Sequence, residues 1–276
     1  MSLIKKQKFD VVLDFSLDHR YSLIAKFLGI KKRLGFNYKN RGRFLTDKID
    51  IDGYSHKHVV EYYLDLLELL GIKAKRYDLE LFVSENNKIK AKNILSGFGI
   101  DDQDLVIGIA PCAGASWGQD AFLKHWPAIR FGQLADRIIN DCKDKIVILG
   151  DASEKPIVEM IINTMHNKVI NLVGRTSLEE LSAVINNLHI LITNDGGPLH
   201  MAVALGKKTV SFFGPVDPRV YGAYPPDGKR HIILRKALDC SPCYSKFHLN
   251  PCQKNKECLK MIDVEEAWEA VNRLLK

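Results

Sequence analysis

Short apolar runs alternate with amphipathic segments from residue 105 to residue 213, and this alternation constrains the fold more than any other feature of the sequence. Each apolar run has the length of a buried strand, and each segment between has apolar residues at helical spacing. The expected strands are 105–110, 145–149, 169–173, 189–193 and 209–213. The expected helices are 126–142, 154–165, 178–186 and 198–205. Such alternation predicts an α/β fold whose mostly parallel sheet is covered by helices on both faces.

The stretch 194–218 is expected to form a ligand cradle, and it reads NDGGPLHMAVALGKKTVSFFGPVDP. Asp195, Gly196 and Gly197 follow a strand and form a turn in which we expect the conformational freedom of glycine to be needed. The helix after this turn presents free N–H groups and the positive end of its dipole, which favour a phosphate or diphosphate. His200 lies on its first turn. The next strand ends in a proline-rich loop at the carboxyl edge of the sheet, where ligands bind in open α/β sheets.

The chain before residue 98 is expected to form a second, smaller α/β region. Its predicted elements are strand 9–15, helix 21–28, strand 32–36, helix 56–70, strand 79–83 and a helix capped by Ser84 that ends near Gly97 or Gly99. The segment 97–104 is the expected linker. Towards the end of the chain we expect a strand at 231–234 and an amphipathic helix at 264–275.

The composition is typical of a globular protein. The 276 residues are 46% hydrophobic and 26% charged, which allows two domains of ordinary size. The sequence contains neither a continuous apolar run of about 18 to 20 residues nor the apolar core of a signal peptide at its start, so we expect a cytoplasmic protein. The net charge of +7 is compatible with an anionic partner.

Five segments together resemble glycosyltransferase family 9, the heptosyltransferases that build the inner core of bacterial lipopolysaccharide. The segments follow one another in the order found in the family. They are FDVVLDFSLDHRYSLIAKFLGIKKRLGF at 9–36, KHWP at 124–127, LGDASE at 149–154, GRTSLEEL at 174–181 and the cradle at 194–218. The cradle is the most specific of these, because a Gly-rich turn, a histidine and FGPxDP at this spacing rarely occur together.

The resemblance implies a GT-B fold, in which two Rossmann-like, doubly wound domains face each other. It divides the chain into a partial acceptor domain at 1–98, a nucleotide-sugar donor domain at 99–262 with a Cys-rich loop at 240–258, and a closing helix at 263–276. The first domain is expected to be incomplete, because roughly two βα units of the family, about 60 residues, have no counterpart here. The family's general base belongs to that part, so either the sequence is truncated or the protein binds its ligand without turning it over.

The resemblance assigns five residues to the diphosphate and sugar of the donor. Displacement of a nucleoside diphosphate builds negative charge on the leaving phosphate, so fixed positive potential is needed there. The residues are Lys124, Asp195, Gly196, Gly197 and His200. The alternatives are a solvated lysine and a histidine that belongs to the core.

Two further residues are assigned to the nucleoside. Glu154 matches the family's ribose-binding acid, since a carboxylate accepts hydrogen bonds from both ribose hydroxyls. Thr176 is expected to line the base pocket. A helix N-terminal acid and a turn residue are the alternatives. Small residues at 113–117 would let a ligand approach, with a plain loop as the alternative.

Four cysteines lie within nineteen residues and follow the spacing C-x2-C-x8-C-x5-C. They are Cys240, Cys243, Cys252 and Cys258. In a cytoplasmic protein such a set predicts structural zinc, although similar cysteines occur in family members described as metal-independent, so a reduced loop is the other interpretation. A catalytic role for them is not expected. Cys112 and Cys142 are expected to be small core or loop residues.

The first half of the chain supplies candidates for acceptor binding. Asp14 and Asp18 are the acids where a displaced general base is to be sought, although the favoured interpretation is that they are acids of a strand-end turn. The aromatic and basic segment 36–44 contains Lys39, Arg41 and Arg43 and is suited to an anionic acceptor. A solvated basic loop is the alternative, and nucleic acid is not an expected partner because no recognised motif accompanies the segment.

The leading interpretation is an inverting, metal-independent glycosyltransferase. It would move a sugar, heptose being the commonest in the family, from an ADP-linked or similar donor to a lipid-linked glycan of the lipopolysaccharide type. This places the protein in the cytoplasm, at the inner face of the membrane. The alternatives are a nucleotide-sugar-binding protein without transfer activity and a zinc-stapled interaction module.

Overall fold

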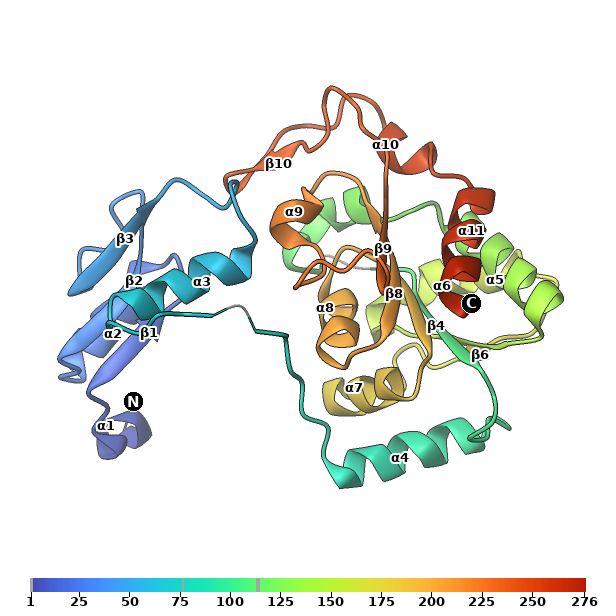
Figure 1. Cartoon of the computed structure of the whole chain (residues 1–276), viewed down its shortest axis with the longest axis horizontal. Coiled ribbons are helices and arrows are strands. Elements are labelled where there is room, and N and C mark those ends of the chain that lie inside the picture. Colours follow the sequence, from blue (N-terminus) through green and yellow to red (C-terminus); the bar gives the residue numbers. More distant parts are fainter. Residues whose placement is uncertain (1, 76, 113–114) are drawn as a thin grey trace. The chain divides into compact units, whose positions relative to one another are not determined.

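A computed structural model describes residues 2–75, 77–112 and 115–276 (Figure 1). The chain divides into two compact units. The first unit comprises residues 1–77 and 245–249, and the second comprises residues 78–244 and 250–276. The helix at 85–96 belongs to the second unit, whereas the resemblance grouped it with the acceptor region.

The first unit is built on a three-stranded parallel sheet in the order β1-β2-β3. Its strands and helices are α1 (Ser2–Gln7), β1 (Val11–Asp14), α2 (His19–Phe27), β2 (Lys32–Tyr38), β3 (Asp47–Ile51) and α3 (Val59–Glu68). The Asp18 side chain caps α2, and Gly29 follows the helix at a φ of +78°, which glycine adopts without strain. The core of the unit includes Leu34 and Leu66, both fully buried.

A cluster of aromatic rings joins the two parts of the chain that form the first unit. The rings of Tyr54 and Phe247 lie 4.8 Å apart between centroids, and those of Tyr38 and Phe247 lie 5.1 Å apart. Lys246 also forms an ion pair with Asp52. The short segment 245–249 is therefore an integral part of this unit.

The second unit contains a six-stranded sheet whose strands are all parallel, in the order β6-β5-β4-β7-β8-β9. The strands are β4 (Val106–Ala110), β5 (Lys145–Ile148), β6 (Ile170–Asn171), β7 (Ile190–Asn194), β8 (Lys208–Phe213) and β9 (His231–Arg235). The chain moves outward from β4 in one direction to β6, then returns to the other side of β4 and continues to β9. This is the strand order of a doubly wound nucleotide-binding sheet, so the predicted α/β parallel architecture is confirmed.

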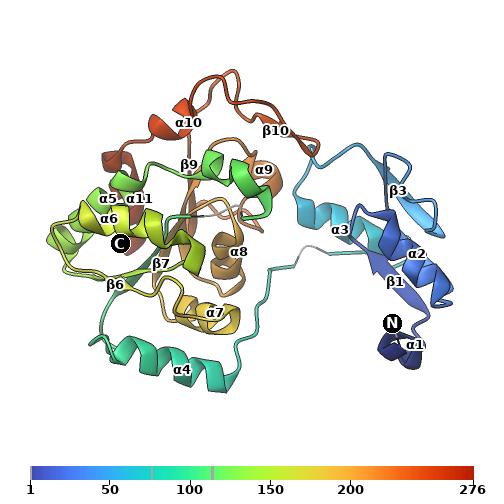
Figure 2. The same cartoon turned by 180° about the vertical axis from the view of Figure 1, so that it is seen from behind.

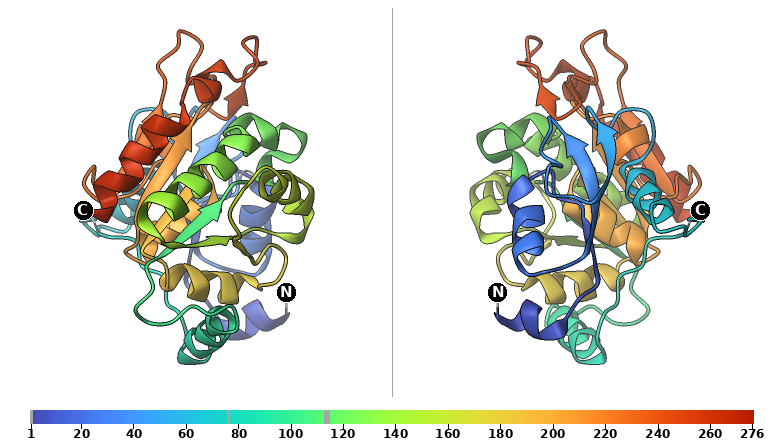
Figure 3. Two further views of the ribbon diagram at one scale, coloured as in Figure 1. Left: turned by 90° about the vertical axis from the view of Figure 1, so that its right-hand side faces the viewer. Right: turned by 90° about the vertical axis from the view of Figure 1, so that its left-hand side faces the viewer.

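Helices cover both faces of this sheet (Figures 1 and 2). One face carries α5 (Ala128–Cys142), α6 (Lys155–Asn163) and α11 (Val264–Leu275), and the other carries α4 (Glu85–Ser96), α7 (Leu178–Asn186) and α8 (Gly197–Ala204). Each group packs its buried side chains on its own side of the strands, and Figure 3 shows the layers from two further directions. The predicted bounds of α7 and α11 are those observed.

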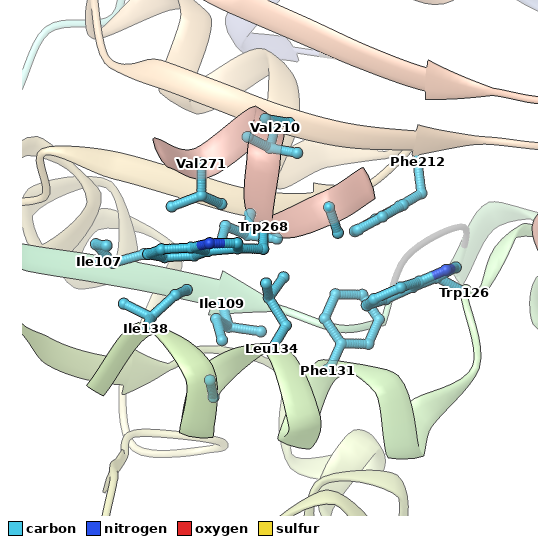
Figure 4. Close-up of a cluster of buried hydrophobic side chains, with 14 of the residues drawn as sticks. Ile107, Ile109, Trp126, Phe131, Leu134, Ile138, Val210, Phe212, Trp268 and Val271 are labelled. Atoms are coloured by element: carbon cyan, nitrogen blue, oxygen red, sulfur yellow. The ribbon is translucent and has the colours of Figure 1, made fainter. Parts of the chain in front are cut away.

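The largest core cluster lies between the sheet and α5, α6 and α11 (Figure 4). The Trp126 ring is stacked on Phe212, with centroids 4.2 Å apart and an angle of 8° between planes. Phe131 meets both rings edge-on, at 4.9 Å and 5.5 Å. This packing fixes the start of α5 against the carboxyl end of β8.

Several smaller elements connect the main ones, and one predicted strand is wrong. The connecting elements are η1 (Ala115–Lys124), η2 (Ala152–Glu154), α9 (Pro218–Tyr221), β10 (Tyr244–Ser245), β11 (His248–Leu249) and α10 (Glu257–Lys260). The described residues 79–83 pair with no strand, although their apolar pattern predicted one. None of the helices in the described ranges is long and apolar enough to cross a bilayer.

The core packing of α5 leads to a stability prediction. Phe131 is fully buried, so Phe131→Ala should lower the free energy of unfolding by about 3 to 5 kcal/mol through lost burial and a residual cavity. Ile129 on the same helix is 49% exposed, and Ile129→Ala is the matched control, with a change within about 0.5 kcal/mol. Urea unfolding followed by tryptophan fluorescence measures both, and equal losses would contradict the packing described.

Candidate functional site

The loops at the carboxyl edge of the six-stranded sheet form the candidate site. They follow β4, β5 and β6 on one side and β7 and β8 on the other. Because β4 is where the strand order reverses, this edge is the position at which open α/β sheets bind ligands. A nucleotide that lay across β4 would reach residues of both sides.

The N-terminus of α8 is open at this edge. Gly196 occupies the capping position, and no side chain in the described part of the chain caps the helix there. A Cβ atom placed on Gly197 would meet no described atom within 4 Å. Among the other helices of the unit, α4 and α11 are capped by Ser84 and Asp263, whereas α5 and α6 have no side-chain cap either. The exposed N–H groups of α8 are therefore available to an anion.

Gly196 and Gly197 are not needed for their backbone conformation, contrary to the expectation from the sequence. Gly196 has a φ of 169°, which is extended backbone that any residue adopts, and Gly197 is the first residue of α8. The turn thus does not depend on a conformation reserved for glycine. What glycine provides at position 197 is open space above the helix end, as the close approach of a ligand requires.

Lys124 and Asp195 meet in a buried ion pair. Lys124 Nζ lies 2.6 Å from Asp195 Oδ2, and the two side chains are only 11% and 6% exposed. Removal of two charges from water costs about as much as their attraction returns, so such a pair adds little net stability. Its effect is to fix an ammonium group beside the start of α8.

The amide of Asn194 explains why Lys124 lies there. Asn194 is completely buried at the end of β7. Its Oδ1 accepts a hydrogen bond from the Trp126 backbone N–H at 2.9 Å, and its Nδ2 donates to the Pro111 carbonyl oxygen at 2.5 Å. One side chain thus joins the ends of β7 and β4 to the KHWP segment, two residues beyond Lys124.

The imidazole of His200 is held neutral near neutral pH. Burial lowers its pKa, the nearby Lys124 ammonium lowers it further, and the Asp195 carboxylate opposes both. The structure therefore brings together Lys124, Asp195 and His200, as predicted, at the open end of α8. A neutral imidazole in this position both donates and accepts hydrogen bonds.

Glu154 lies at the end of β5, on the other side of β4. Its Oε2 accepts a hydrogen bond from the Asp151 backbone N–H at 2.9 Å, which completes a capping box at η2. A Cβ on Gly150 would collide with this carboxylate. Burial raises the pKa of Glu154, and burial raises that of the neighbouring Cys112 thiol to about 12, with the Glu154 charge adding to the effect. The helix N-terminal interpretation of Glu154 therefore describes its present hydrogen bond, and its ribose role stays a prediction.

The loop after β6 contains Thr176, which is half-buried. The next residue, Ser177, accepts from the Glu180 backbone N–H at 3.2 Å, while Glu180 Oε2 accepts from the Ser177 N–H at 3.0 Å. These two hydrogen bonds form a capping box, for which the S-x-x-E spacing of Ser177 and Glu180 is the sequence signal. Thr176 lies beside the β5 loop because β6 pairs with β5, and its contact with a base stays a prediction. Of the predicted small-residue loop at 113–117, Ala113 and Gly114 lie outside the described residues.

The Cys-rich segment does not support structural zinc. All four cysteines, Cys240, Cys243, Cys252 and Cys258, are free thiols around a cavity of about 300 Å³. Within the described ranges no three His, Cys, Asp or Glu side chains are grouped so as to hold a metal ion. Burial raises the pKa of the Cys243 and Cys258 thiols.

The two candidate bases in the first unit have local roles. The Asp14 carboxylate accepts from the backbone N–H and the hydroxyl of Ser16, at 2.9 Å and 2.5 Å. Asp18 caps α2, and hydrogen bonds from Arg20 lower its pKa to about 2. The contacts of Asp14 belong to a turn at the end of a strand, and those of Asp18 belong to a helix cap. Both acids therefore have local structural roles, as the alternative to a general base expected.

Trp117, the last residue of the segment 113–117, was not singled out from the sequence as a site residue, yet it belongs to the same site. Its ring centroid lies 4.3 Å from Lys124 Nζ, and its ring contacts Tyr244 at 4.9 Å. A lone tryptophan in a loop of small and polar residues was the available signal. The contact itself joins residues seven positions apart across a kink at Gly118, where φ is +56°.

The sequence is similar to that of a known protein family. The sequence profile of glycosyltransferase family 9 (heptosyltransferase) matches residues 2–254. A lipooligosaccharide heptosyltransferase 2 from Campylobacter jejuni is 30% identical over 242 residues, which cover 86% of this chain and 69% of that protein. The chain spans 62% to 69% of the length of the first curated relatives it matches.

Solved structures share the fold. A family 9 glycosyl transferase from Veillonella parvula superposes with a TM-score of 0.85 at 26% identity, covering 99% of this chain and 76% of that one. An E. coli structure described as ADP-heptose lps heptosyltransferase II gives 0.77 at 22% identity, with 99% and 78% covered. Both carry the GT-B fold, so the predicted fold class is confirmed.

The neutral state of His200 leads to a pH prediction. Its folded-state pKa lies below the ordinary value of 6.5, so the unfolded chain binds more protons below that pH and stability falls as the pH drops from 7 towards 5. His200→Gln should lose less stability over this range than the unsubstituted chain. The midpoints of urea unfolding at pH 7, 6 and 5 measure the loss of stability in each protein. Burial also lowers the pKa of His231, but this residue is present in both proteins, so its contribution cancels when the two losses are compared. Identical losses in the two proteins would contradict a lowered His200 pKa.

Proposed function

The chain belongs to glycosyltransferase family 9, and we propose that it transfers a heptose-type sugar from a nucleoside-diphosphate donor to a glycan of the lipopolysaccharide type. The observation that carries this proposal is the Lys124–Asp195 pair, with His200, at the uncapped start of α8. This arrangement offers an ammonium group and free backbone N–H groups to one anion. A diphosphate leaving group fits both.

The proposed reaction is a single displacement with inversion. An acceptor hydroxyl forms a bond to the anomeric carbon while the bond from that carbon to the diphosphate oxygen breaks. The hydroxyl proton passes to a base, and the nucleoside diphosphate leaves with the bonding electron pair. Lys124 and the α8 N-terminus stabilise the charge that develops on the leaving oxygen. Electrostatic stabilisation by groups already held in place is usually the largest single contribution to catalysis.

The donor is proposed to lie across β4. Its diphosphate and sugar occupy the β7 side, with Asp195, Gly196, Gly197 and His200 as the sugar and phosphate contacts. Its nucleoside occupies the β5 and β6 side, where Glu154 would accept from the ribose hydroxyls and Thr176 would line the base. We propose ADP as the carrier, since one solved relative is described as using ADP-heptose.

The first unit is proposed to bind the acceptor. Its basic segment holds three cations over aromatic rings: Lys39 and Arg41 lie 5.1 Å and 5.8 Å from the Tyr38 ring, and Arg43 lies 4.8 Å from that of Phe44. Beside them is a cavity of about 560 Å³, lined by polar side chains that include Asn37, Asp50, Asp52, His56 and Tyr62. The three cations suit acidic groups of a glycan, and the polar lining of the cavity suits its hydroxyls. A lipid-linked acceptor would bring the protein to the inner face of the membrane.

Donor binding is tested by calorimetric titration with ADP, UDP and GDP. We expect one nucleotide, ADP, to bind saturably. Lys124→Ala and Lys124→Met should weaken this binding about ten- to hundredfold through loss of a charged contact, and His200→Ala about three- to tenfold. Lys168→Ala, a change at an exposed lysine before β6, is the matched control and should leave the Kd unchanged.

The outcomes separate the alternatives. Absence of nucleotide binding by the folded chain would overturn the donor site. Binding of ADP without transfer to a lipopolysaccharide acceptor would support the nucleotide-sugar-binding protein over the enzyme. The Met variant keeps the aliphatic part of Lys124, so it separates loss of the charge from loss of packing if Lys124→Ala melts at a lower temperature.

A second prediction concerns metal ions. Because Lys124 and the α8 N-terminus would supply the positive potential, nucleotide binding and transfer should be unchanged after dialysis against EDTA. Added Mg²⁺ or Zn²⁺ should not raise the rate. A loss of at least tenfold on chelation, restored by one of these ions, would contradict a metal-independent mechanism.

A further inference from the structure

We propose that Trp117 is a positioning residue for Lys124, and that its indole ring holds the ammonium group where the donor diphosphate needs it. This inference rests on the proposed donor site. Trp117 does not itself need to contact the diphosphate in order to position Lys124. The contact that matters is the one between the indole face and Lys124 Nζ, whose distance to the ring centroid is 4.3 Å.

The ammonium group lies between an anion and an aromatic face. Asp195 Oδ2 is 2.6 Å from Nζ on one side, and the Trp117 ring covers another side. An ammonium group has three N–H donors, so these two partners leave donor capacity for a third. The Lys124 side chain is 11% exposed, which places this remaining capacity at a small opening rather than in bulk water.

An aromatic ring suits this position better than a second carboxylate. Two carboxylates would give the pocket a net negative charge and repel a diphosphate. The indole face attracts a cation through its quadrupole but carries no net charge. Trp117 therefore restricts the lysine without reducing the positive potential that the phosphates would meet.

Trp117 is itself fixed by the residues that form the cradle. It packs on a cluster of buried side chains from α8, β8 and the loop after β8, which are Leu199, Val203, Phe213 and Val216. Its ring also contacts Tyr244, whose backbone N–H donates to the Pro215 carbonyl oxygen at 2.9 Å. The indole ring is thus fixed relative to α8, and through it Lys124 is held to the same helix that would bind the phosphates.

The Cys-rich segment 240–258 also contacts the loop that contains Lys124, at the end of the loop away from Trp117. Lys256 Nζ donates to the carbonyl oxygens of Phe122 and His125, at 3.0 Å and 3.4 Å, on either side of Lys124. The Lys256 backbone N–H in turn donates to Cys252 Sγ at 3.3 Å. With Tyr244 at one end and Lys256 at the other, this segment holds the Lys124 loop from two directions, which gives it a role that needs no metal.

The test is a double-mutant cycle read out as the Kd for ADP. Trp117→Leu keeps apolar volume but removes the quadrupole, and should weaken ADP binding about five- to thirtyfold. Trp117→Phe keeps an aromatic face and should restore binding to within about threefold of the unsubstituted chain. In a Lys124→Met background, Trp117→Leu should change the Kd less than twofold, because Trp117 acts through Lys124.

The controls and outcomes separate this inference from the proposed function. Phe98→Leu replaces an aromatic residue that is 44% exposed after α4 and should leave the Kd unchanged. An unchanged Kd in Trp117→Leu, or an equal loss with and without Lys124, would overturn the positioning role while the donor site stands. Absence of ADP binding by the unsubstituted chain would overturn the donor site, and this inference with it. Thermal melts establish that each variant is folded.

Discussion

The buried amide of Asn194 holds the candidate site together. It sits at the end of β7 with no exposed surface, and its two hydrogen bonds reach the chain after β4 and the start of the α5 segment. Neither partner is close to it in sequence. Loss of the amide would leave a backbone N–H and a carbonyl unsatisfied in the interior, each at a cost of about 1 to 3 kcal/mol. Asn194 thus anchors the chain two residues beyond Lys124, and its hydrogen bonds act together with the contacts of Lys124 to Asp195 and Trp117.

The electrostatics of the site are arranged before any ligand arrives. The helix end is left without a side-chain cap in the described part of the chain, the ammonium group is already fixed, and the imidazole is already neutral. A flexible lysine on the surface would have to lose rotamer freedom when it bound an anion, at about 1 to 2 kcal/mol. Here folding has already imposed that order. Such a site stabilises an anion through charges held in fixed positions, without a side chain that donates a proton to it. This is what the departure of a diphosphate would require.

Local signals in the sequence predicted the elements whose ends are chemically marked. The predicted bounds of α7 and α11 are those observed, and the side chains of Ser177 and Asp263 cap their starts. The regular alternation after residue 105 predicted the parallel sheet. The strand β3 was missed because three of the five residues of DKIDI are charged. The strand expected at 79–83 is wrong because these residues pair with no strand, and Phe82 in their middle is 87% exposed. Structural zinc is not supported either: the spacing of four cysteines along the chain does not determine whether their sulfur atoms come within coordinating distance, and no group that could hold a metal ion is found among the described residues.

The segment 245–249 gives the chain an interleaved connectivity. Its residues belong to the first unit, where the ring of Phe247 packs on Tyr54 and Lys246 pairs with Asp52, while the residues on both sides of it belong to the second. The polypeptide therefore passes from one unit to the other three times. A break at residue 77 would neither release the first unit nor leave it whole, because a piece of its packing is encoded more than 160 residues later. The two units are consequently not exchangeable modules: recombination that replaced one would have to carry a matching aromatic insert within the other.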